Sequence, residues 1–358
     1  MKRVAIVGGG IMGASIAWHL ARRGAAVTLF EKAHPGAGAT GDSFAWINAT
    51  FSKQPRHYYE LNRQGIDAWR RLEMEMATPL NIQWGGSVEW CAAGPDFEEF
   101  RKGVERHRHW GYATRLINRE EMGQLLPGVE PGPIDAASFS DDEGTLDPVA
   151  AVNALLGEAR EFGANVVYPR EVTGLELVDN RVQSVATTDG LVEADVMVLA
   201  CGVGTPKIAA MAGVKVLLKD SAGVLAHTAA QPRLLNRVAL GPGSHMKQDS
   251  SGRVVVGDNF AGGDGQDASA ESGERLLRQA ARYLGGMHTG LERVSLGWRV
   301  MPVDEFPIVG FAEECPNLYV VATHSGVTLA PLIGEYAVRE ILEGVRVEML
   351  APYRLRRF

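Results

Sequence analysis

Residues 3–31 read RVAIVGGGIMGASIAWHLARRGAAVTLFE, and this stretch decides the fold. Residues 3–7 are apolar and β-branched and end at glycines, which predicts a short buried parallel strand. Residues 11–23 predict a helix with Gly24 as its stop signal, and residues 25–30 predict a second strand. A strand, a glycine turn, a helix and a strand within about 30 residues make one βαβ unit.

The glycines of this unit follow the pattern GxGxxG, in which each glycine has its own expected role. Gly8 permits the tight turn, Gly10 lets backbone amides approach a diphosphate, and Gly13 lets the helix pack closely on the strand. The phosphates would lie at the positive end of the helix dipole. The pattern alone is weak, but an acid, Glu31, follows at the end of the second strand, as a Rossmann-type dinucleotide site requires.

Glu31 bears on which dinucleotide binds. Its carboxylate can accept hydrogen bonds from ribose hydroxyls but repels a 2′-phosphate, which disfavours NADP and leaves NAD possible. Residues 36–43, GAGATGDS, then follow where a simple NAD domain would continue with another βα unit. Small residues with free amides suit a long cofactor lying across the sheet, which favours FAD. A flexible surface loop is the competing interpretation.

Composition and charge exclude several classes of protein. The chain has 358 residues, of which 46% are hydrophobic and 22% charged, as in soluble globular proteins. A net charge of -7 without a long basic stretch argues against a nucleic-acid partner. No apolar run reaches the ~18 residues of a membrane span, and no cluster has metal-ligand spacing. Three scattered cysteines argue against a disulfide scaffold or structural zinc and favour a cytoplasmic location.

The remaining elements follow from periodicity and from turn signals. Residues 147–148, Asp-Pro, predict the start of a helix that Gly163 ends. Turns at residues 179–180 and 189–190 divide 170–200 into a β-meander whose last strand is central. Other helices are predicted at 55–76, 96–110, 270–284 and 331–342, and strands at 84–90, 195–200, 318–321 and repeatedly within 214–305.

Four segments resemble the glycine oxidase, D-amino acid oxidase and sarcosine oxidase superfamily, the DAO family. They are VAIVGGGIMGASIA at 4–17 with Glu31, GATGDSFAWIN at 38–48, ADVMVLACGVG at 194–204, and GWRVMPVDEFPIVG at 297–310 followed by HSGVTLAPLIG at 324–334. The resemblance implies an α/β fold with a discontinuous Rossmann-type FAD-binding domain at 1–85, 141–214 and 306–358. An antiparallel-sheet substrate domain at 86–140 and 215–305 would cover the flavin.

The resemblance also implies a reaction. A small amine or amino acid, of the glycine, D-amino acid or N-methyl type, would pass a hydride to flavin N5 and leave an imine. The electrons would go on to O2 or another acceptor. Three alternatives remain: a flavin dehydrogenase of a 2-hydroxy acid or polyol phosphate, a flavin subunit that transfers electrons, and a tRNA-modifying flavoprotein, which the acidic balance disfavours.

The C-terminal motif carries the more specific expectations. Residues 328–330 are expected to precede a helix opened by Pro331, so that their amides and the helix dipole stabilise the charge of reduced flavin. Gly326 would allow close approach, and an ordinary βα turn is the competing interpretation. Arg299 aligns with the arginine that binds the substrate carboxylate in glycine-oxidase-like members, where a guanidinium fork suits a carboxylate. A structural salt bridge is the alternative for Arg299.

Two departures from the family also matter. Sarcosine oxidases attach flavin through a cysteine where Gly297 stands here, so FAD should be non-covalent. They also have a carboxylate-binding lysine where Thr328 aligns, so Arg299 would act without it.

The remaining candidates are less specific. His245 and Lys247 either point into the substrate pocket or belong to a surface hairpin. Phe44, Trp46 and Asn48 either line the pocket or simply pack. The predicted catalytic residues are Arg299, His245, Lys247 and Trp46. The predicted cofactor-binding residues are Gly8, Gly10, Ile11, Met12, Gly13, Glu31, Lys32, Thr40, Gly41, Ser43, Val172, Gly202, Gly326, Val327 and Thr328.

Overall fold

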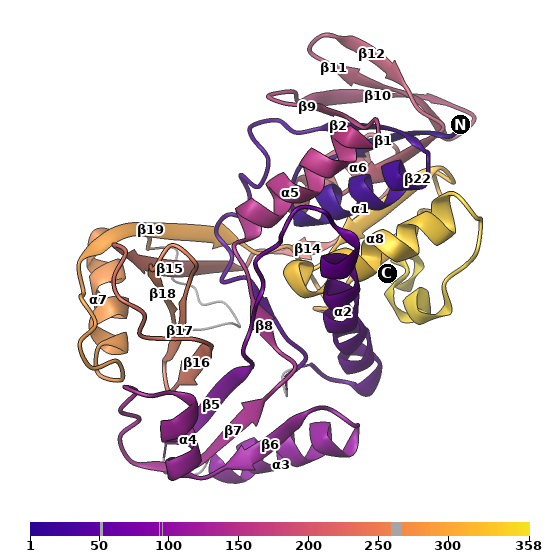
Figure 1. Ribbon diagram of the computed structural model, residues 1–358. Coiled ribbons are helices and arrows are strands. Elements are labelled where there is room, and N and C mark those ends of the chain that lie inside the picture. The colour runs from indigo at the N-terminus through magenta and orange to yellow at the C-terminus, as the bar shows by residue number, and fades with distance from the viewer. Residues whose placement is uncertain (51–52, 93, 95, 259–266) are drawn as a thin grey trace.

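Two large β-sheets organise the chain, one mostly parallel and the other mostly antiparallel (Figure 1). The computed structural model describes residues 1–50, 53–92, 94, 96–258 and 267–358. Both sheets collect strands from segments that are far apart in the sequence, as the colours of Figure 1 show.

The six-stranded sheet is built around the first strand of the chain. Every neighbouring pair is parallel except the edge pair β21–β22. The chain builds outward from β1 to β2 and β9 and then returns to the other side of β1 with β13, which creates a topological switch point between β1 and β13. In spatial order the strands are β21 (Ile308–Phe311), β22 (Leu318–Ala322), β13 (Val196–Leu199), β1 (Arg3–Val7), β2 (Ala26–Phe30) and β9 (Asn165–Val167).

Different layers cover the two faces of this sheet. Helices α1 (Ile11–Arg22), α2 (Arg56–Glu75), α5 (Pro148–Glu161) and α8 (Gly326–Ile341) share one apolar core with one face. The meander β10 (Val172–Val178), β11 (Arg181–Thr187) and β12 (Gly190–Glu193), together with α6 (Thr205–Ala210), covers the other. Between α5 and α8, α1 is buried along its whole length except at Arg22, which explains its nearly continuous apolar sequence.

The eight-stranded sheet lies beside this three-layer unit. Helix α7 (Ala270–Ala280) packs on one face through Leu276 and Leu277, against core residues that include Val88 and Met246. In order, its strands are β19 (Leu291–Trp298), β15 (Ala222–Thr228), β18 (Val254–Gly257), β17 (Ser244–Gln248), β16 (Val238–Gly241), β5 (Ser87–Ala92), β7 (Ile134–Ser140) and β6 (Thr114–Ile117). Helices α3 (Phe97–His109) and α4 (Arg119–Leu125) flank β6 and β7.

Small elements join the two sheets. The central strand β8 (Gly144–Thr145) pairs with β3 (Trp46–Ile47) on one side and β4 (Gln83–Trp84) on the other. A second short pair joins β14 (Leu218–Lys219) to β20 (Met301–Pro302). Three 3-10 segments complete the described structure: η1 (Gly202–Gly204), η2 (Glu348–Tyr353) and η3 (Leu355–Arg357).

Most predicted elements are confirmed, including the opening βαβ unit and the helix capped by Asp147. The meander at 170–200 is confirmed in part: β10, β11 and β12 form a sheet of their own, and the strand predicted as its central last member, β13, is central in the six-stranded sheet instead. The predicted strand at 84–90 is wrong as one element. It divides into β4 and β5, which belong to different sheets. The break falls at Gly86, whose φ is 74° and whose N–H donates to the carbonyl of Glu143 at 2.9 Å.

The start predicted for the last helix is also wrong, because α8 begins at Gly326 and Pro331 lies inside it. A proline has no N–H to donate to the carbonyl four residues earlier, which here belongs to Val327. The indole Nε1 of Trp69 donates to that carbonyl instead, at 2.8 Å. A donor from α2 therefore allows the helix to continue through Pro331.

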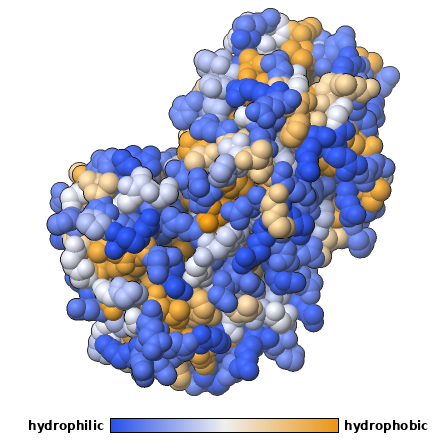
Figure 2. All heavy atoms as spheres, viewed as in Figure 1, coloured by the Kyte–Doolittle hydropathy of each residue, from blue (hydrophilic) through white to orange (hydrophobic). Residues whose placement is uncertain are grey.

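The surface fits a protein whose apolar residues are mostly inside. On the face in Figure 2, hydrophilic residues dominate, and the visible hydrophobic residues form scattered patches rather than one continuous band. None of the helices that the structure describes is both long and apolar enough to cross a membrane. The predicted division into two domains stays a prediction.

Candidate functional site

The predicted cofactor residues gather where parallel strands end. Gly8 follows β1, Glu31 follows β2, Gly202 lies just beyond β13, and Gly326 lies just beyond β22. These four strands are neighbours in the order β22-β13-β1-β2, so their carboxyl ends meet at one edge of the sheet. This edge includes the switch point, where doubly wound sheets bind their ligands.

Two glycines of the first motif have no room for a side chain. A Cβ on Gly13 would lie 1.9 Å from the carbonyl oxygen of Gly8. A Cβ on Gly8, whose φ is 108°, would lie 2.4 Å from the carbonyl oxygen of Ala200. These glycines therefore let α1, β1 and the end of β13 approach one another as backbone.

The start of α1 presents backbone amides that can bind an anion. The N–H of Ile11 donates to Thr40 Oγ1 at 3.1 Å. No described residue accepts from the N–H of Gly10, Met12 or Gly13, although Met12 and Gly13 are buried. Buried amides without acceptors at the start of a helix suit a phosphate, so these residues fit the diphosphate of a dinucleotide.

Glu31 is held in place by the backbone around the motif. Its carboxylate accepts from the N–H of Gly9 at 2.8 Å and of Ala33 at 2.9 Å. Each carboxylate oxygen can accept a further hydrogen bond, so Glu31 is still able to bind ribose hydroxyls.

The other predicted cofactor residues lie around this edge. Lys32 is exposed, and Ser43 Oγ accepts from the N–H of Ala45 at 2.9 Å. Gly41 closes the 36–41 turn by donating to the carbonyl of Gly36 at 2.9 Å. Val172 is buried at the start of β10, in the same core as Val7 and Phe30.

A second helix start faces the site. No described residue accepts from the N–H of Gly326, Val327 or Thr328, and a Cβ on Gly326 would meet no atom within 4 Å. These are the first three amides of α8, so the donors expected here are the helix's own and not those of residues 328–330 ahead of it. The Thr328 hydroxyl is occupied, since Oγ1 accepts from the N–H of Asn48 at 3.2 Å and donates to the carbonyl of Trp46 at 3.3 Å.

A buried carboxylate, Glu143, holds the segment that carries Trp46. It accepts from Trp46 Nε1 at 2.9 Å, Ser87 Oγ at 2.6 Å, Tyr112 OH at 2.6 Å and the N–H of Ala49 at 3.3 Å. Burial raises the pKa of Glu143 to about 7, against the lowering effect of these hydrogen bonds. Sequence analysis missed Glu143, because its four partners come from segments 31 to 97 residues away.

Arg299 follows β19 and lies over the eight-stranded sheet. Its N–H donates to the carbonyl of Ser221 at 2.8 Å. A Cβ on Gly223 would lie 2.5 Å from Arg299 Nη2, so the guanidinium group rests on this glycine. Asp304, the aspartate of the same motif, pairs with Arg357 at 2.7 Å and 3.0 Å and so serves the C-terminal tail.

Lys53 is a buried cation that sequence analysis missed. Its side chain is 8% exposed, and Nζ donates to Ser325 Oγ, just before α8, at 2.8 Å. No Asp or Glu of the described residues forms an ion pair with Lys53. Burial, with the charges of Lys53 and Arg299 in the same direction, lowers the pKa of His324 to about 3. Two cations therefore act on a neutral imidazole beside the start of α8.

The surface-hairpin interpretation of His245 and Lys247 is wrong. Lys247 is 3% exposed, and Nζ donates to Thr145 Oγ1 at 3.0 Å and to the carbonyl of Leu146 at 3.1 Å. Burial lowers the pKa of Lys247 to about 8. Lys247 thus ties β17 to the segment before α5. His245 lies on the same face of β17, and burial, with the charge of Arg299 in the same direction, lowers its pKa to about 4.

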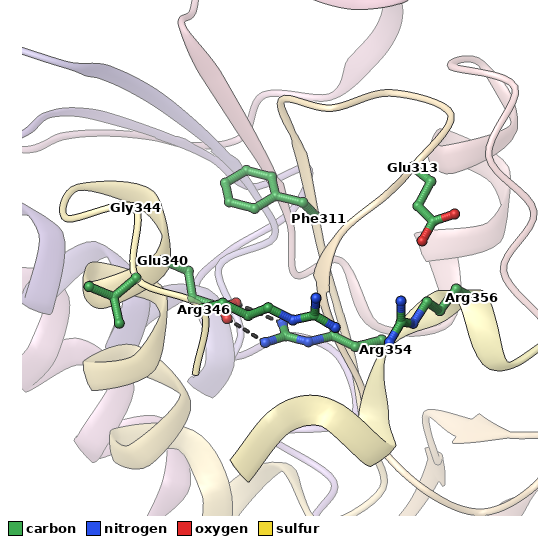
Figure 3. Close-up of a pocket in the computed structure, with 8 residues that line it drawn as sticks. Phe311, Glu313, Glu340, Gly344, Arg346, Arg354 and Arg356 are labelled. Carbon is green, nitrogen blue, oxygen red and sulfur yellow. Dashed lines mark hydrogen bonds and ion pairs between the residues drawn. The ribbon is translucent and has the colours of Figure 1, made fainter. Parts of the chain in front are cut away.

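A surface pocket at the opposite end of α8 is separate from this site (Figure 3). Its walls include Glu340, Arg346 and Arg354, and Figure 3 shows Arg354 paired with Glu340. Helix α8 has 16 residues, so at 1.5 Å per residue its two ends are about 24 Å apart. The pocket therefore lies far from the amides of Gly326–Thr328.

Comparison with known proteins gives one family over nearly the whole chain. The sequence model described as "DAO: FAD dependent oxidoreductase" matches residues 3–340. Glycine oxidase of Bacillus licheniformis is 27% identical over 98% of this chain and 96% of its own. The mitochondrial dimethylglycine dehydrogenase of Mus musculus is 28% identical over 58% of this chain and 24% of its own.

Solved structures share the fold. Glycine oxidase from Geobacillus kaustophilus has a TM-score of 0.90 at 23% identity and covers 100% of both chains. L-proline dehydrogenase from P. horikoshii has a TM-score of 0.88 at 24% identity, covering 99% of this chain and 98% of that one. At these identities, the structures support the architecture alone.

Proposed function

The chain belongs to the DAO family of FAD-dependent oxidoreductases, and from this premise we propose that it oxidises the C–N bond of a small amino acid or N-alkyl amino acid. FAD, when bound, supplies the chemistry by accepting a hydride from the substrate carbon at N5. The chain's own residues bind the cofactor, hold the substrate and set the local charge.

One observation carries the proposal: positive charge gathers at the start of α8, where the Lys53 ammonium group is buried. Lys53 has no carboxylate partner among the described residues, and its charge and that of Arg299 both act on His324. The positive end of the α8 dipole adds to them. Such a place favours an anion, and the carboxylate of an amino acid meets that requirement.

The two imidazoles on which these cations act, His245 and His324, carry no charge at neutral pH. The low pKa values of His245, about 4, and His324, about 3, keep both imidazoles neutral above about pH 5. The substrate amine must itself be neutral to lose a hydride. The site is therefore expected to bind the carboxylate by charge and to accept the amine without protonating it.

We further propose that FAD is held non-covalently. A Cβ on Gly297 would lie 2.8 Å from the carbonyl oxygen of Asp42, so a cysteine does not fit where sarcosine oxidases attach their flavin. We propose O2 or another electron acceptor as the oxidant of the reduced flavin. A cytoplasmic location agrees with three free cysteines, Cys91, Cys201 and Cys315.

The deciding experiment mixes the purified flavoprotein, without oxygen, with a panel of amino acids, N-methyl amino acids and 2-hydroxy acids. Loss of absorbance at about 450 nm, where oxidised flavin absorbs, identifies the substrate class. The proposal expects bleaching by at least one amine. Bleaching by hydroxy acids alone would replace it with the hydroxy-acid dehydrogenase. If no compound bleaches the flavin but a protein partner can reduce or oxidise it, the electron-transfer alternative would be favoured.

Arg299→Ala tests the carboxylate site. Loss of a charged hydrogen bond costs about 1.5–3 kcal/mol, so KM for a carboxylate substrate should rise roughly ten- to hundredfold. Arg293→Ala is the matched control, because Arg293 lies in β19 just before Arg299 but is 53% exposed. An unchanged KM in Arg299→Ala would remove Arg299 from the substrate site.

A further inference from the structure

Glu89 is an acidic residue in the middle of β5. Side chains alternate along this strand, so Val88 and Trp90 enter the core under α7 while Ser87 and Glu89 face the other way. Ser87 donates to Glu143 on that opposite face. No described residue donates a hydrogen bond to Glu89 or forms an ion pair with it.

The strand register places Glu89 on the same face as the candidate substrate residues. Glu89 pairs with Leu240 of β16, Leu240 pairs with His245 of β17, and His245 pairs with Gly257 of β18. Residues directly opposite one another in neighbouring strands point to the same face of a sheet. Glu89 therefore belongs to the row of side chains that leads towards Arg299.

Glu89 is closely surrounded but still accessible. Its side chain keeps part of its surface exposed, unlike Val88 and Trp90 beside it. At the same time, burial, together with the negative charge of Glu143, raises the pKa of Glu89 to about 8. A small group of a ligand can therefore reach the Glu89 carboxyl, although protein surrounds most of it. Keeping an unpaired carboxyl there is costly unless something binds it.

This face of the sheet carries a positive charge at one end and an acidic group at the other. Arg299 lies over Gly223 of β15, whereas Glu89 lies on β5, four strands further along the order β15-β18-β17-β16-β5. Four spacings of about 4.8 Å separate these strands by roughly 19 Å. Even allowing for the reach of the two side chains, glycine is too short to contact both ends.

We propose that Glu89 is a specificity-determining residue that receives a second, positively charged group of the substrate. The substrate would then be an amino acid or N-alkyl amino acid with an ammonium or guanidinium group remote from its carboxylate. This inference rests on the proposed function. A cation at Glu89 would also relieve the repulsion between Glu89 and Glu143.

The test compares pairs of compounds that differ in charge but little in shape. Arginine is compared with citrulline and lysine with norleucine, in both enantiomers and as N-methyl derivatives, by anaerobic bleaching of the flavoprotein. The cationic member of a pair should reach its half-maximal bleaching rate at a concentration at least about tenfold lower than the neutral member needs. A charged hydrogen bond predicts a difference of this size. In Glu89→Gln this ratio should fall to about one.

Controls separate charge from folding. Cys91→Ala changes the next residue on the same face of β5 and should keep the wild-type ratio. Glu89→Asp keeps the negative charge and should still prefer the cationic member of each pair. This variant is used if Glu89→Gln does not hold flavin. Equal rates for both members of every pair in the wild type, or an unchanged ratio in Glu89→Gln, would overturn the inference while amine oxidation stands. Bleaching by no amine at all would overturn the proposed function as well.

Discussion

The two sheets use polar groups in opposite ways. In the six-stranded sheet, the central strands β1, β13 and β22 are almost wholly apolar, and the polar contacts of the site begin where the strands end. In the eight-stranded sheet, polar side chains such as Ser87, Glu89 and Lys247 stand within the strands, on one face. The edge proposed for the cofactor thus offers mainly backbone amides, and the face proposed for the substrate offers mainly side chains.

The coverage of each sheet explains this difference. Layers cover both faces of the parallel sheet, so a ligand can reach it only at its edge. The antiparallel sheet buries one face under α7, while its other face combines polar side chains with a smaller apolar cluster that packs against Phe44. Cofactor binding at the edge of the parallel sheet should therefore depend on how closely backbone segments can approach one another. Substrate binding on the face of the antiparallel sheet should depend on the charge of its side chains.

The largest effect is expected from Gly13→Ala, which tests the first half of this contrast without changing any charge. Its methyl group would lie 1.9 Å from the carbonyl oxygen of Gly8, so backbone must move. We expect a loss of about 3 kcal/mol or more in the free energy of unfolding, and little bound flavin. Denaturation curves and the flavin-to-protein absorbance ratio measure the two.

Gly157→Ala is the control for Gly13→Ala. Gly157 lies inside α5, and a Cβ there would meet no atom within 4 Å. This change should stabilise the protein by about 0.5–1 kcal/mol, because alanine favours a helix. If Gly13→Ala kept its full flavin content, flavin binding would not depend on the close approach of Gly13 to Gly8.

Glu143→Ala tests the second half of the contrast. It leaves the hydroxyls of Ser87 and Tyr112 without their acceptor. Trp46 and the N–H of Ala49 each lose one hydrogen bond, and the N–H of Ala49 keeps its bond to Tyr112 OH at 3.2 Å. We expect a loss of about 3 kcal/mol in the free energy of unfolding and a raised KM, with flavin still bound at saturating FAD. Loss of flavin binding with an unchanged free energy of unfolding would show that cofactor binding also depends on Glu143, and would contradict the contrast between the two sheets.

The smallest loss of stability is expected from removing the hydrogen bond that Trp69 donates to the backbone of α8. Trp69→Phe removes the donor to the carbonyl of Val327 and should cost about 1–2 kcal/mol. In a Pro331→Ala background the new N–H can donate to that carbonyl, so the same change should cost less. A double-mutant cycle by chemical denaturation measures the difference, and equal costs in both backgrounds would reject this account of Pro331.

The contrast also explains which features the sequence predicts. The βαβ unit and its glycines lie within 31 residues, so their spacing is visible in the sequence. Glu143 and Lys53 escape notice, because burial and partners from distant segments give them their character. Glu89 escapes notice, because only the pairing of β5 with β16 places it in its row of side chains. The start of α8 escapes prediction for the same reason. Proline usually occupies the first turn of a helix, and only the contact from Trp69 shows why this one lies deeper.

The short segment 143–147 has a mechanical consequence. Glu143 holds the Trp46 segment, β8 pairs with both β3 and β4, Lys247 donates to Thr145, and Asp147 caps α5 at 2.9 Å. Five consecutive residues thus fasten both sheets to one another. Swinging the sheets apart would break the bonds that Ser87 and Lys247 of the eight-stranded sheet make to this segment, so we expect substrate to enter and product to leave while the two halves stay in place.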